Sequence, residues 1–484
     1  ANFVRDTLSN WVTSSASTHP FIGAIKGFRA ALAEDENLMK LMMAGGGGGG
    51  FYDSNPDDVR KLLADKVPPG QMNAFMRTIV TPRNAWRVYR KIGAATENAN
   101  RLAVFKAVVG NGGSVAEAAY ESRDVLNFAM QGDYAAMRWL VQTVPFMNAR
   151  VQGLFRLYRG ARDNPRSFAM KGMAIMAATM ALLLRNNDRD EYEELREWDK
   201  DTYWHLFIGG EHYRIPKPFE VGIIFATMPE RIMRWGSGRD SHQILMKQIQ
   251  AAVMDTLAFN PTPQLIKPII EQYANRSMFT GSPIVGMAER NLKPEAQFDS
   301  WTSETARELA KALPDFAPEW LRSPVRLQAA VRAYTGAMGM YVLTASDYVT
   351  RAMAGYPEEP SKSVYDLPVV GRFMRDPEPR TTKYSDQLYD MLEEANALHA
   401  TINRYRREGQ MQQAADLLEE NRGKLAVRGR LNAIALQVRN INNQVRLVQL
   451  NRSLDGDEKA ERIKALLERK NDAVRRVAPL AGAF

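Results

Sequence analysis

The feature that most constrains this chain is a long apolar stretch at residues 168–184, FAMKGMAIMAATMALLL. From Gly172 to Leu184 no residue is charged, and only Thr179 carries a polar side-chain group. A helix of this length rises roughly 20 Å, which is shorter than the ~30 Å hydrocarbon core of a bilayer. We therefore expect a helix buried on all sides in the protein core, and a segment that meets a membrane or another subunit is the alternative.

The large apolar side chains of this stretch would carry either role. They are Met173, Ile175, Met176, Met180, Leu182, Leu183 and Leu184. No apolar run reaches the ~18 residues of a conventional spanning helix. The first residues also lack the basic and apolar regions of a signal peptide. The sequence therefore does not indicate a conventional membrane protein.

Composition bounds the class of protein. The chain has 484 residues, which is more than one hydrophobic core usually serves, so we expect several helical subdomains. Hydrophobic residues make up 45% and charged residues 25%, as in globular proteins. The absence of cysteine excludes disulfides and thiolate metal sites. The net charge of +9 is only a weak indication of nucleic-acid or anionic-lipid binding.

Helix starts are marked by a capping residue followed by proline, as at Asn164-Pro165 and Ser323-Pro324. Together with apolar residues at helical spacing, these starts predict a series of helices. The main ones cover residues 82–109, 114–131, 133–160, 165–185, 241–259, 263–276, 302–313 and 324–348.

One segment is different. Two short β-prone runs, 203–208 and 211–215, flank Gly209-Gly210, which predicts a β-hairpin. A lone hairpin is marginally stable, so we expect it to pack against the 168–184 region.

The remaining chain divides by composition. We expect a helical lead-in over 1–44, a flexible joint at the six glycines 45–50, a helical domain over 51–350 and a proline-rich linker over 351–380. Residues 381–484 are rich in Arg, Asn and Gln and contain no dense apolar core by composition. This pattern is typical of long antiparallel helices or a coiled-coil arm used for assembly. The predicted fold is a mainly α, multi-subdomain helical bundle with one small β-hairpin at about 203–215 and a C-terminal long-helix region.

No catalytic constellation is visible. The sequence contains no nucleophile-elbow, dinucleotide or phosphate-loop motif, and its five histidines lack metal-ligand spacing. His205 and His212 fall on the two predicted strands, and we interpret them as surface histidines. We therefore predict no catalytic, metal-binding or cofactor-binding residue.

A row of arginines on one predicted long helix is a candidate for contact with the DNA backbone. They are Arg428, Arg430, Arg439, Arg446 and Arg452. No aromatic residues alternate with them for stacking on single strands, and solvated helical faces are the favoured interpretation.

Several uncommon strings resemble the helical domain near the C-terminus of the large polyvalent proteins of tailed bacteriophages. The resemblance begins in residues 96–162, with TENANRLAVFKAVVGNGGSVAEAAYESRDVLNFAMQGD and VPFMNARVQGLFRLYR. It continues with PKPFEVG and MPER within 216–231, NRSMFTGSPIV at 275–285, TSE at 302–304 and SPVRLQAAVRAYTG at 323–336. It covers roughly residues 1–350. Within these strings, Glu97 and Arg101 have the spacing of a helical ion pair, and Glu230 is a plausible buried partner for an arginine.

The resemblance implies a function without a catalytic residue. Some proteins of this family are internal virion proteins of short-tailed phages that are ejected with DNA into the host envelope. The expectation is a structural ejection protein, or the C-terminal part of one, that forms a homo-oligomer and contacts other internal core or ejection proteins and the portal. DNA and the host membrane are further expected partners. It would lie in the capsid and, after ejection, in the host envelope.

Two alternatives stay open. One is a capsid-internal scaffold or packaging module of a polyvalent effector protein, without a channel role. The other is an enzyme with an unrecognised cleft, which is the least favoured. A peptidoglycan-cleaving domain of the family would lie outside this chain.

Overall fold

The protein is mainly α-helical. The computed structural model describes residues 2–14, 19–46, 82–125, 134–135, 147–254, 266–278, 282–286, 289–367, 370–376, 379 and 381–484. Helices make up 74% of the structure, and the described residues also form one small three-stranded antiparallel sheet. The predicted fold class is therefore confirmed.

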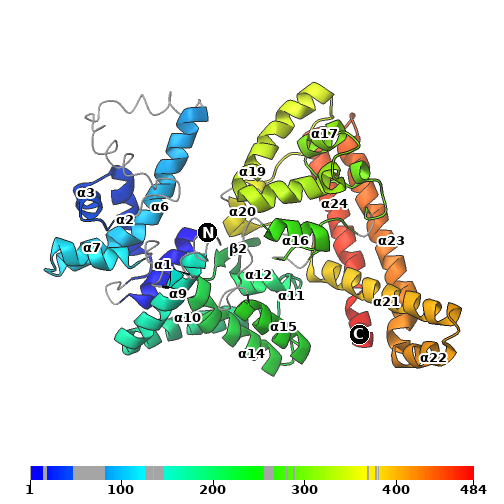
Figure 1. The fold of residues 1–484 in the computed structure, drawn as a ribbon, viewed down its shortest axis with the longest axis horizontal. Coiled ribbons are helices and arrows are strands. Elements are labelled where there is room, and N and C mark those ends of the chain that lie inside the picture. The colour runs from blue at the N-terminus through cyan, green and yellow to red at the C-terminus, as the bar shows by residue number, and fades with distance from the viewer. Residues whose placement is uncertain are drawn as a thin grey trace. The chain divides into compact units, whose positions relative to one another are not determined.

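The chain forms two compact units (Figure 1). Unit 1 comprises residues 1–186, 201–205 and 215–261, and unit 2 comprises 187–200, 206–214 and 262–484. The chain thus passes between the units within the hairpin region. The five-part division predicted from composition stays a prediction.

The helices of unit 1 precede and follow the hairpin. They are α1 (Asn2–Thr13), α2 (Ile22–Ala33), α3 (Glu36–Met43), α6 (Pro82–Gly110), α7 (Val115–Arg123), α9 (Met147–Asp163), α10 (Pro165–Asn186), α13 (Phe219–Gly222), the π-helical turn η1 (Ile223–Thr227), α14 (Met228–Gly236) and α15 (His242–Ala252).

Close packing of small residues joins α2 to α6. The position of a Cβ on Gly27 would lie 2.1 Å from the carbonyl oxygen of Ala99, so only glycine fits at this crossing. Around it, α2, α3, α6 and α7 share a core that includes Leu41, Leu102 and Phe105, all fully buried. The predicted helical pair Glu97–Arg101 is present on α6, with 3.2 Å between Oε1 and Nη1.

A second core of unit 1 lies beside α10. Val12 of α1, Ile175 of α10, Val221 of α13 and Ala226 of η1 are its buried residues. Gly172 allows η1 to approach, because a Cβ there would lie 2.5 Å from the Phe225 ring.

The predicted hairpin is confirmed as β1 (Tyr203–Ile208) and β2 (Glu211–Pro216). Its predicted packing against 168–184 is also confirmed. The indole Nε1 of Trp204 donates to Oγ1 of Thr179 at 2.8 Å, and the Asn186 amide donates to the His205 carbonyl at 2.7 Å. Thr179, the only polar residue of the uncharged run, thus ties α10 to the hairpin.

Unit 2 holds the remaining elements, while α12 (Glu197–Thr202), β1 and β2 have residues in both units. The elements wholly in unit 2 are α11 (Asp190–Glu193), α16 (Lys267–Ala274), η3 (Pro294–Ala296), α17 (Glu304–Ala312), α18 (Glu319–Arg322), α19 (Pro324–Ala354), η4 (Val364–Asp366), α20 (Val370–Phe373), β3 (Met374–Arg375), α21 (Lys383–Arg407), α22 (Met411–Glu420), α23 (Arg422–Leu450), α24 (Gly456–Arg475) and η5 (Ala478–Ala483).

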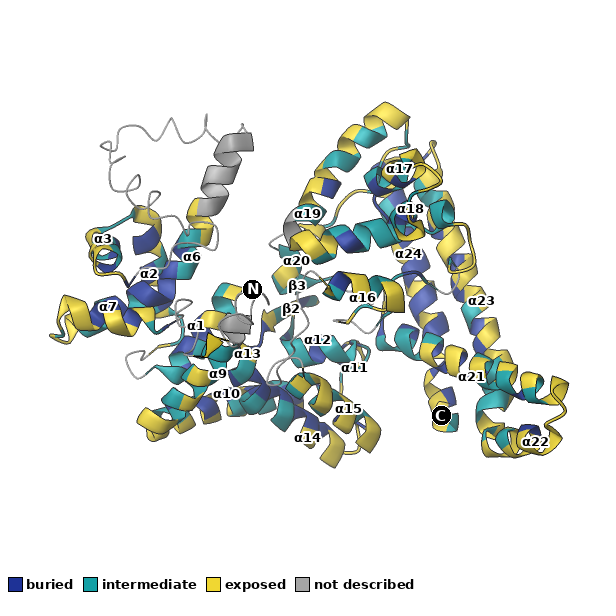
Figure 2. Ribbon diagram, in the orientation of Figure 1, coloured by how far each residue is buried: buried dark blue, intermediate teal, exposed yellow. Residues whose placement is uncertain are grey.

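The C-terminal helices have a dense core of their own, so the expectation that residues 381–484 lack one is wrong. α21, α23, α24 and η5 bury Leu388, Met391, Leu392, Leu431, Ile434, Val438, Val474, Val477 and Leu480. These residues recur every three or four positions, so polar-rich helices still present a continuous apolar stripe. Buried residues accordingly recur along α23 and α24 (Figure 2).

The predicted antiparallel course of these helices is present. Glu394 of α21 pairs with Lys424 near the start of α23, whereas Leu388, earlier in α21, shares a core with Leu431. α24 likewise runs back along α23, because Ile441 shares a core with Ile463 and Leu431 shares one with Val474.

The segment predicted to be an extended linker, 351–380, contains η4, α20 and β3. β3 extends the hairpin by pairing antiparallel with β2, in the register His212 with Arg375 and Tyr213 with Met374. α19 begins at Pro324 as predicted, but it is kinked at Gly336, where φ is 60° and ψ is −142°.

Some predictions fall on residues that the structure does not describe. They include most of the glycine joint, whose described part ends at residue 46, and the chain on to residue 81. Parts of the predicted helices 114–131, 133–160, 241–259 and 263–276 also lie outside the described residues.

Candidate functional site

α10 presents an apolar face that the rest of unit 1 leaves exposed. This helix has 22 residues and is long and apolar enough to cross a membrane, yet only 22% of its most apolar 18-residue stretch is buried. The length of the uncharged run did not reveal that this helix is long enough to cross a membrane, because Lys171 interrupts the run without ending the helix. One such helix is weak evidence for a membrane span, since core helices meet the same criterion.

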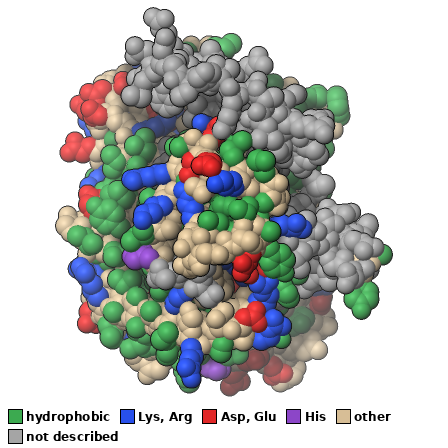
Figure 3. All heavy atoms as spheres, turned by 90° about the vertical axis from the view of Figure 1, so that its left-hand side faces the viewer, with side chains coloured by type: hydrophobic (Ala, Val, Ile, Leu, Met, Phe, Trp, Pro, Cys, Tyr) green, Lys and Arg blue, Asp and Glu red, His purple; other side chains and the backbone are tan. Residues whose placement is uncertain are grey.

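The seven apolar residues predicted for this segment divide between two faces. Ile175 and Leu183 are buried, Met176, Met180 and Leu182 are half-buried, and Met173 and Leu184 are 52% and 60% exposed. Met170 adds to the exposed face and is 63% exposed. In the view of Figure 3, groups of hydrophobic side chains lie at the surface among Lys and Arg side chains. α10 is therefore neither a fully buried helix nor a polar surface helix.

The five candidate arginines do not form one row. Arg428, Arg439 and Arg446 share a face of α23, because they are spaced by nearly whole helical turns, while Arg430 points elsewhere and Arg452 follows the helix end. Arg428 donates to the Asn396 side chain at 2.8 Å, and Arg452 donates to the Gly355 carbonyl at 3.0 Å. Arg430 and Arg439 are exposed.

A buried ionic cluster in unit 1 connects α14 to the chain on either side of it. The Lys217 ammonium lies 2.5 Å from Glu230, so a lysine is one partner of this buried carboxylate, and its predicted pairing with an arginine stays a prediction. Arg231 contacts Asp201 at 2.6 Å and Asp240 at 3.0 Å, and Arg234 contacts Asp240 at 2.9 Å.

These charged groups pair with one another, and all of them except Asp201 are almost fully buried, so the cluster holds α14 within the fold of unit 1 rather than presenting an open ligand site. The sequence signal for it was the three arginines between Glu230 and Asp240, which does not reveal how these groups pair.

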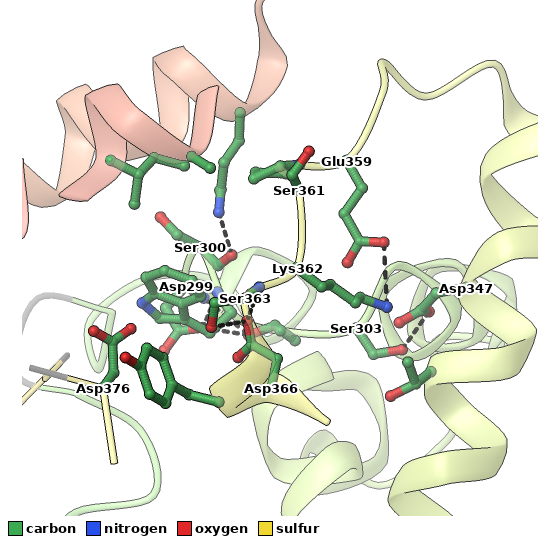
Figure 4. Close-up of a pocket in the computed structure, with 18 of the residues that line it drawn as sticks. Asp299, Ser300, Ser303, Asp347, Glu359, Ser361, Lys362, Ser363, Asp366 and Asp376 are labelled. Atoms are coloured by element: carbon green, nitrogen blue, oxygen red, sulfur yellow. Dashed lines mark hydrogen bonds and ion pairs between the residues drawn. The ribbon is translucent and has the colours of Figure 1, made fainter. Parts of the chain in front are cut away.

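A cavity of about 1170 Å³ lies within unit 2. Its walls come from the residues before and within α17, the second half of α19, the segment 356–376, the end of α23 and α24. On one side, the buried carboxylate of Asp199 pairs with Arg214 and Arg375, two residues that line the cavity. Figure 4 shows the acidic, hydroxyl and lysine side chains that surround it.

Several of the side chains labelled in Figure 4 hold backbone segments in place. The Ser303 hydroxyl donates to Asp347 at 2.6 Å and also accepts from the Ala306 N–H as the N-cap of α17. Asp347 accepts a second bond from the Thr305 N–H at 2.8 Å. Ser303 and Asp347 therefore fix the start of α17 against α19, and the described residues that line the cavity include no histidine to activate Ser303 as a nucleophile.

Two further contacts in the cavity wall join α17 to α19 and to the segment after α19. Glu304 accepts from Arg351, and burial raises the pKa of this carboxyl even though the Arg351 charge opposes the shift. The Tyr356 hydroxyl donates to Glu308 at 2.6 Å, and burial together with this bond raises its pKa to about 12.

Two guanidinium groups lie against the same aromatic ring in the cavity. The Arg307 guanidinium carbon lies 4.1 Å from the centre of the Phe298 ring, and the Arg446 guanidinium carbon lies 4.5 Å from the same centre. Arg446 was a sequence candidate for phosphate contact, but Phe298 and Arg307 were not, because nothing in the sequence links them to α23.

The two histidines of the hairpin are buried, so their interpretation as surface residues is wrong. His205 is 2% and His212 is 6% exposed. His212 stacks on Phe207 with ring centres 4.3 Å apart. In the described part of the chain, no three His, Asp or Glu residues are grouped to hold a metal ion.

These features define a mainly α-helical protein with two units, a three-stranded sheet, an exposed apolar helix and a polar cavity. Residues 189–370 match the family model of large polyvalent protein associated domain 38. The chain therefore carries a large polyvalent protein associated domain, as the resemblance predicted, and this domain indicates a phage-associated protein. Comparisons with curated proteins and with solved structures give no match.

The matched residues include the hairpin, the buried ionic cluster and much of the cavity wall. Of the strings that carry the resemblance, those between 216 and 336 lie inside the match, and those in 96–162 lie outside it. α10 and the C-terminal helices are also outside it.

Proposed function

We propose that this chain is a structural internal virion protein of a bacteriophage that helps to deliver DNA across the host envelope. It would assemble with copies of itself and with other ejection proteins, and it would act without a catalytic site of its own. Its places of action would be the capsid interior and, after ejection, the host envelope.

The observation that carries this proposal is the exposed apolar face of α10. A helix with Met170, Met173 and Leu184 exposed leaves hydrophobic surface in water, and such surface is typical of contacts with protein or lipid. Methionine suits a surface that changes partners, because its unbranched side chain adapts to different neighbours. The large polyvalent protein associated domain supports the phage context.

A contact with DNA would be secondary. Arg430 and Arg439 are exposed on α23 and could meet phosphates, but they lie on different faces of the helix. We therefore place DNA delivery in the assembly as a whole rather than in a strong binding site on one chain.

The test is a measurement of mass and oligomeric state by light scattering, in buffer and then with liposomes that contain anionic lipid. The informative variant is Met173→Asp with Leu184→Asp, which places two charges on the exposed face and leaves the buried Ile175 and Leu183 intact. We expect the wild-type chain to form a discrete oligomer or to float with liposomes, and we expect this variant to lose that behaviour while keeping its helical circular dichroism.

A matched control is Met353→Asp on α19, where the methionine is 84% exposed in unit 2. This variant should behave like the wild type. A wild-type monomer that ignores liposomes and DNA would contradict the proposal, and a packaging scaffold without a channel role would then be the better model.

A further inference from the structure

The cavity of unit 2 brings together two arginines that are far apart in the sequence. Arg307 lies in α17, Arg446 lies near the end of α23, and both line the cavity. Both guanidinium carbons lie within 4.5 Å of the centre of the Phe298 ring. They are therefore separated by no more than the sum of those two short distances, and two positive charges are held near one another.

Among the described residues, neither guanidinium makes a hydrogen bond or an ion pair. The Nε–H of Arg307 is buried and has no acceptor. The carboxylates closest to Arg307 in the same wall are already engaged, since Glu304 binds Arg351 and Glu308 accepts from Lys311 and Tyr356. The Nε–H of Arg307 is thus left without a protein acceptor, and both guanidinium-bearing residues line the cavity.

The electrostatics of the pair agree with this geometry. Burial lowers the pKa of Arg446, and the nearby charge of Arg307 lowers it further. A face of an aromatic ring attracts a cation, but it does not neutralise two of them. Two like charges beside one ring become more favourable when an anion binds to both of them.

We propose that Arg307 and Arg446 form a binding site for a phosphoryl group, with Phe298 as the platform that orients both guanidinium groups. Guanidinium groups bind phosphate oxygens through paired, charge-assisted hydrogen bonds. The cavity has room for a small phosphorylated molecule around that group, because its volume of about 1170 Å³ slightly exceeds that of most ligand pockets. The phosphoryl group could equally belong to the DNA backbone, which presents the same oxygens.

This site is distinct from the apolar face of α10, which lies in unit 1, and it does not depend on the proposed role in the envelope. It is also distinct from a row of surface arginines on α23. Of the five arginines predicted from the sequence, Arg446 is the one that shares the Phe298 ring with Arg307.

The experiment measures binding of pyrophosphate to the full chain by isothermal titration calorimetry at low salt. The informative variant is Arg446→Gln, because the exposed Arg446 side chain can be replaced without disturbing the core. The matched control is Arg430→Gln, which removes the same charge from an exposed position of the same helix. Arg307→Gln tests the second guanidinium, and circular dichroism with a thermal melt checks that each variant is folded.

We expect the wild-type chain to bind pyrophosphate and Arg446→Gln to bind it about tenfold more weakly or less, with Arg430→Gln close to the wild type. A DNA duplex added in competition identifies the source, since it displaces pyrophosphate through the same two arginines only if the site accepts the backbone. The proposal is overturned if the wild type does not bind pyrophosphate, if folded Arg446→Gln binds as well as the wild type, or if Arg430→Gln loses as much. Oligomer formation and liposome binding should be unchanged in Arg446→Gln, so this result is independent of the proposed function.

Discussion

Lys217 and Glu230 form a buried ion pair in unit 1, with Nζ 2.5 Å from Oε2 and with side chains only 3% and 8% exposed. Removing the charge of one partner takes a counter-ion away from a charge that stays buried. We therefore expect Glu230→Gln to destabilise the protein by about 3–5 kcal/mol. Urea unfolding of the full chain, followed by circular dichroism, measures this change in the free energy of unfolding.

The double variant Lys217→Met with Glu230→Leu is the control for this pair. It removes both charges, so it should cost much less than the single substitution and could even stabilise the protein. A single Glu230→Gln that leaves the free energy of unfolding unchanged would show that the pair is not buried as described.

His212 makes stability depend on pH. Burial, with a smaller contribution from the Arg214 charge, lowers the pKa of His212 to about 4. An unfolded chain has a histidine pKa of about 6.5, so between these values the unfolded state binds more protons than the folded state. The stabilisation from neutral His212 is complete above about pH 6.5 and is lost as the pH falls toward 4, with a total of up to roughly 3 kcal/mol.

The variant His212→Gln cannot titrate, so its free energy of unfolding should fall less steeply than that of the wild type between pH 7 and pH 4.5. Equal slopes for the wild type and His212→Gln would contradict the burial of this ring.

Two helical glycines, one at the crossing of α2 and α6 and one on α23, lead to opposite expectations. Gly27→Ala would place a Cβ 2.1 Å from the Ala99 carbonyl oxygen, so we expect it to cost about 1–3 kcal/mol or more despite the better helix propensity of alanine. Gly429→Ala on α23 meets nothing within 4 Å and should stabilise by up to about 1 kcal/mol. Thermal unfolding of both variants shows whether each substitution lowers or raises stability. A Gly27→Ala variant as stable as the wild type would argue against this packing.

Sequence patterns predicted the helices best where the signal was local. α10 begins at Pro165 and α19 at Pro324, each directly after the predicted capping position, and the Ser114 hydroxyl accepts from the Glu117 N–H. The Gly209-Gly210 turn predicted the hairpin for the same reason. Capping, proline and turn geometry involve only neighbouring residues, so a sequence contains all the necessary information.

Contacts between distant residues were not predictable in this way. β3 is two residues long, and its pairing with β2 depends on a partner about 160 residues earlier in the chain. Phe298, Arg307 and Arg446 meet only because α17 and α23 both line one cavity. The core of the C-terminal helices was missed because polar residues dominate the composition there, while the apolar residues are concentrated on one side of each helix.

Leu431 tests that core directly. It is fully buried among α21, α23 and η5, so Leu431→Ala removes apolar contacts and leaves a cavity. Such substitutions cost about 2–5 kcal/mol. Leu436 lies little more than one turn further along α23 and is 58% exposed, so Leu436→Ala should change the free energy of unfolding by less than about 0.5 kcal/mol. If residues 381–484 were instead a coiled-coil arm that packs only on assembly, both substitutions would be nearly neutral in a monomer, and Leu431→Ala would act only on the oligomer. Urea unfolding of the two variants at several protein concentrations separates these cases.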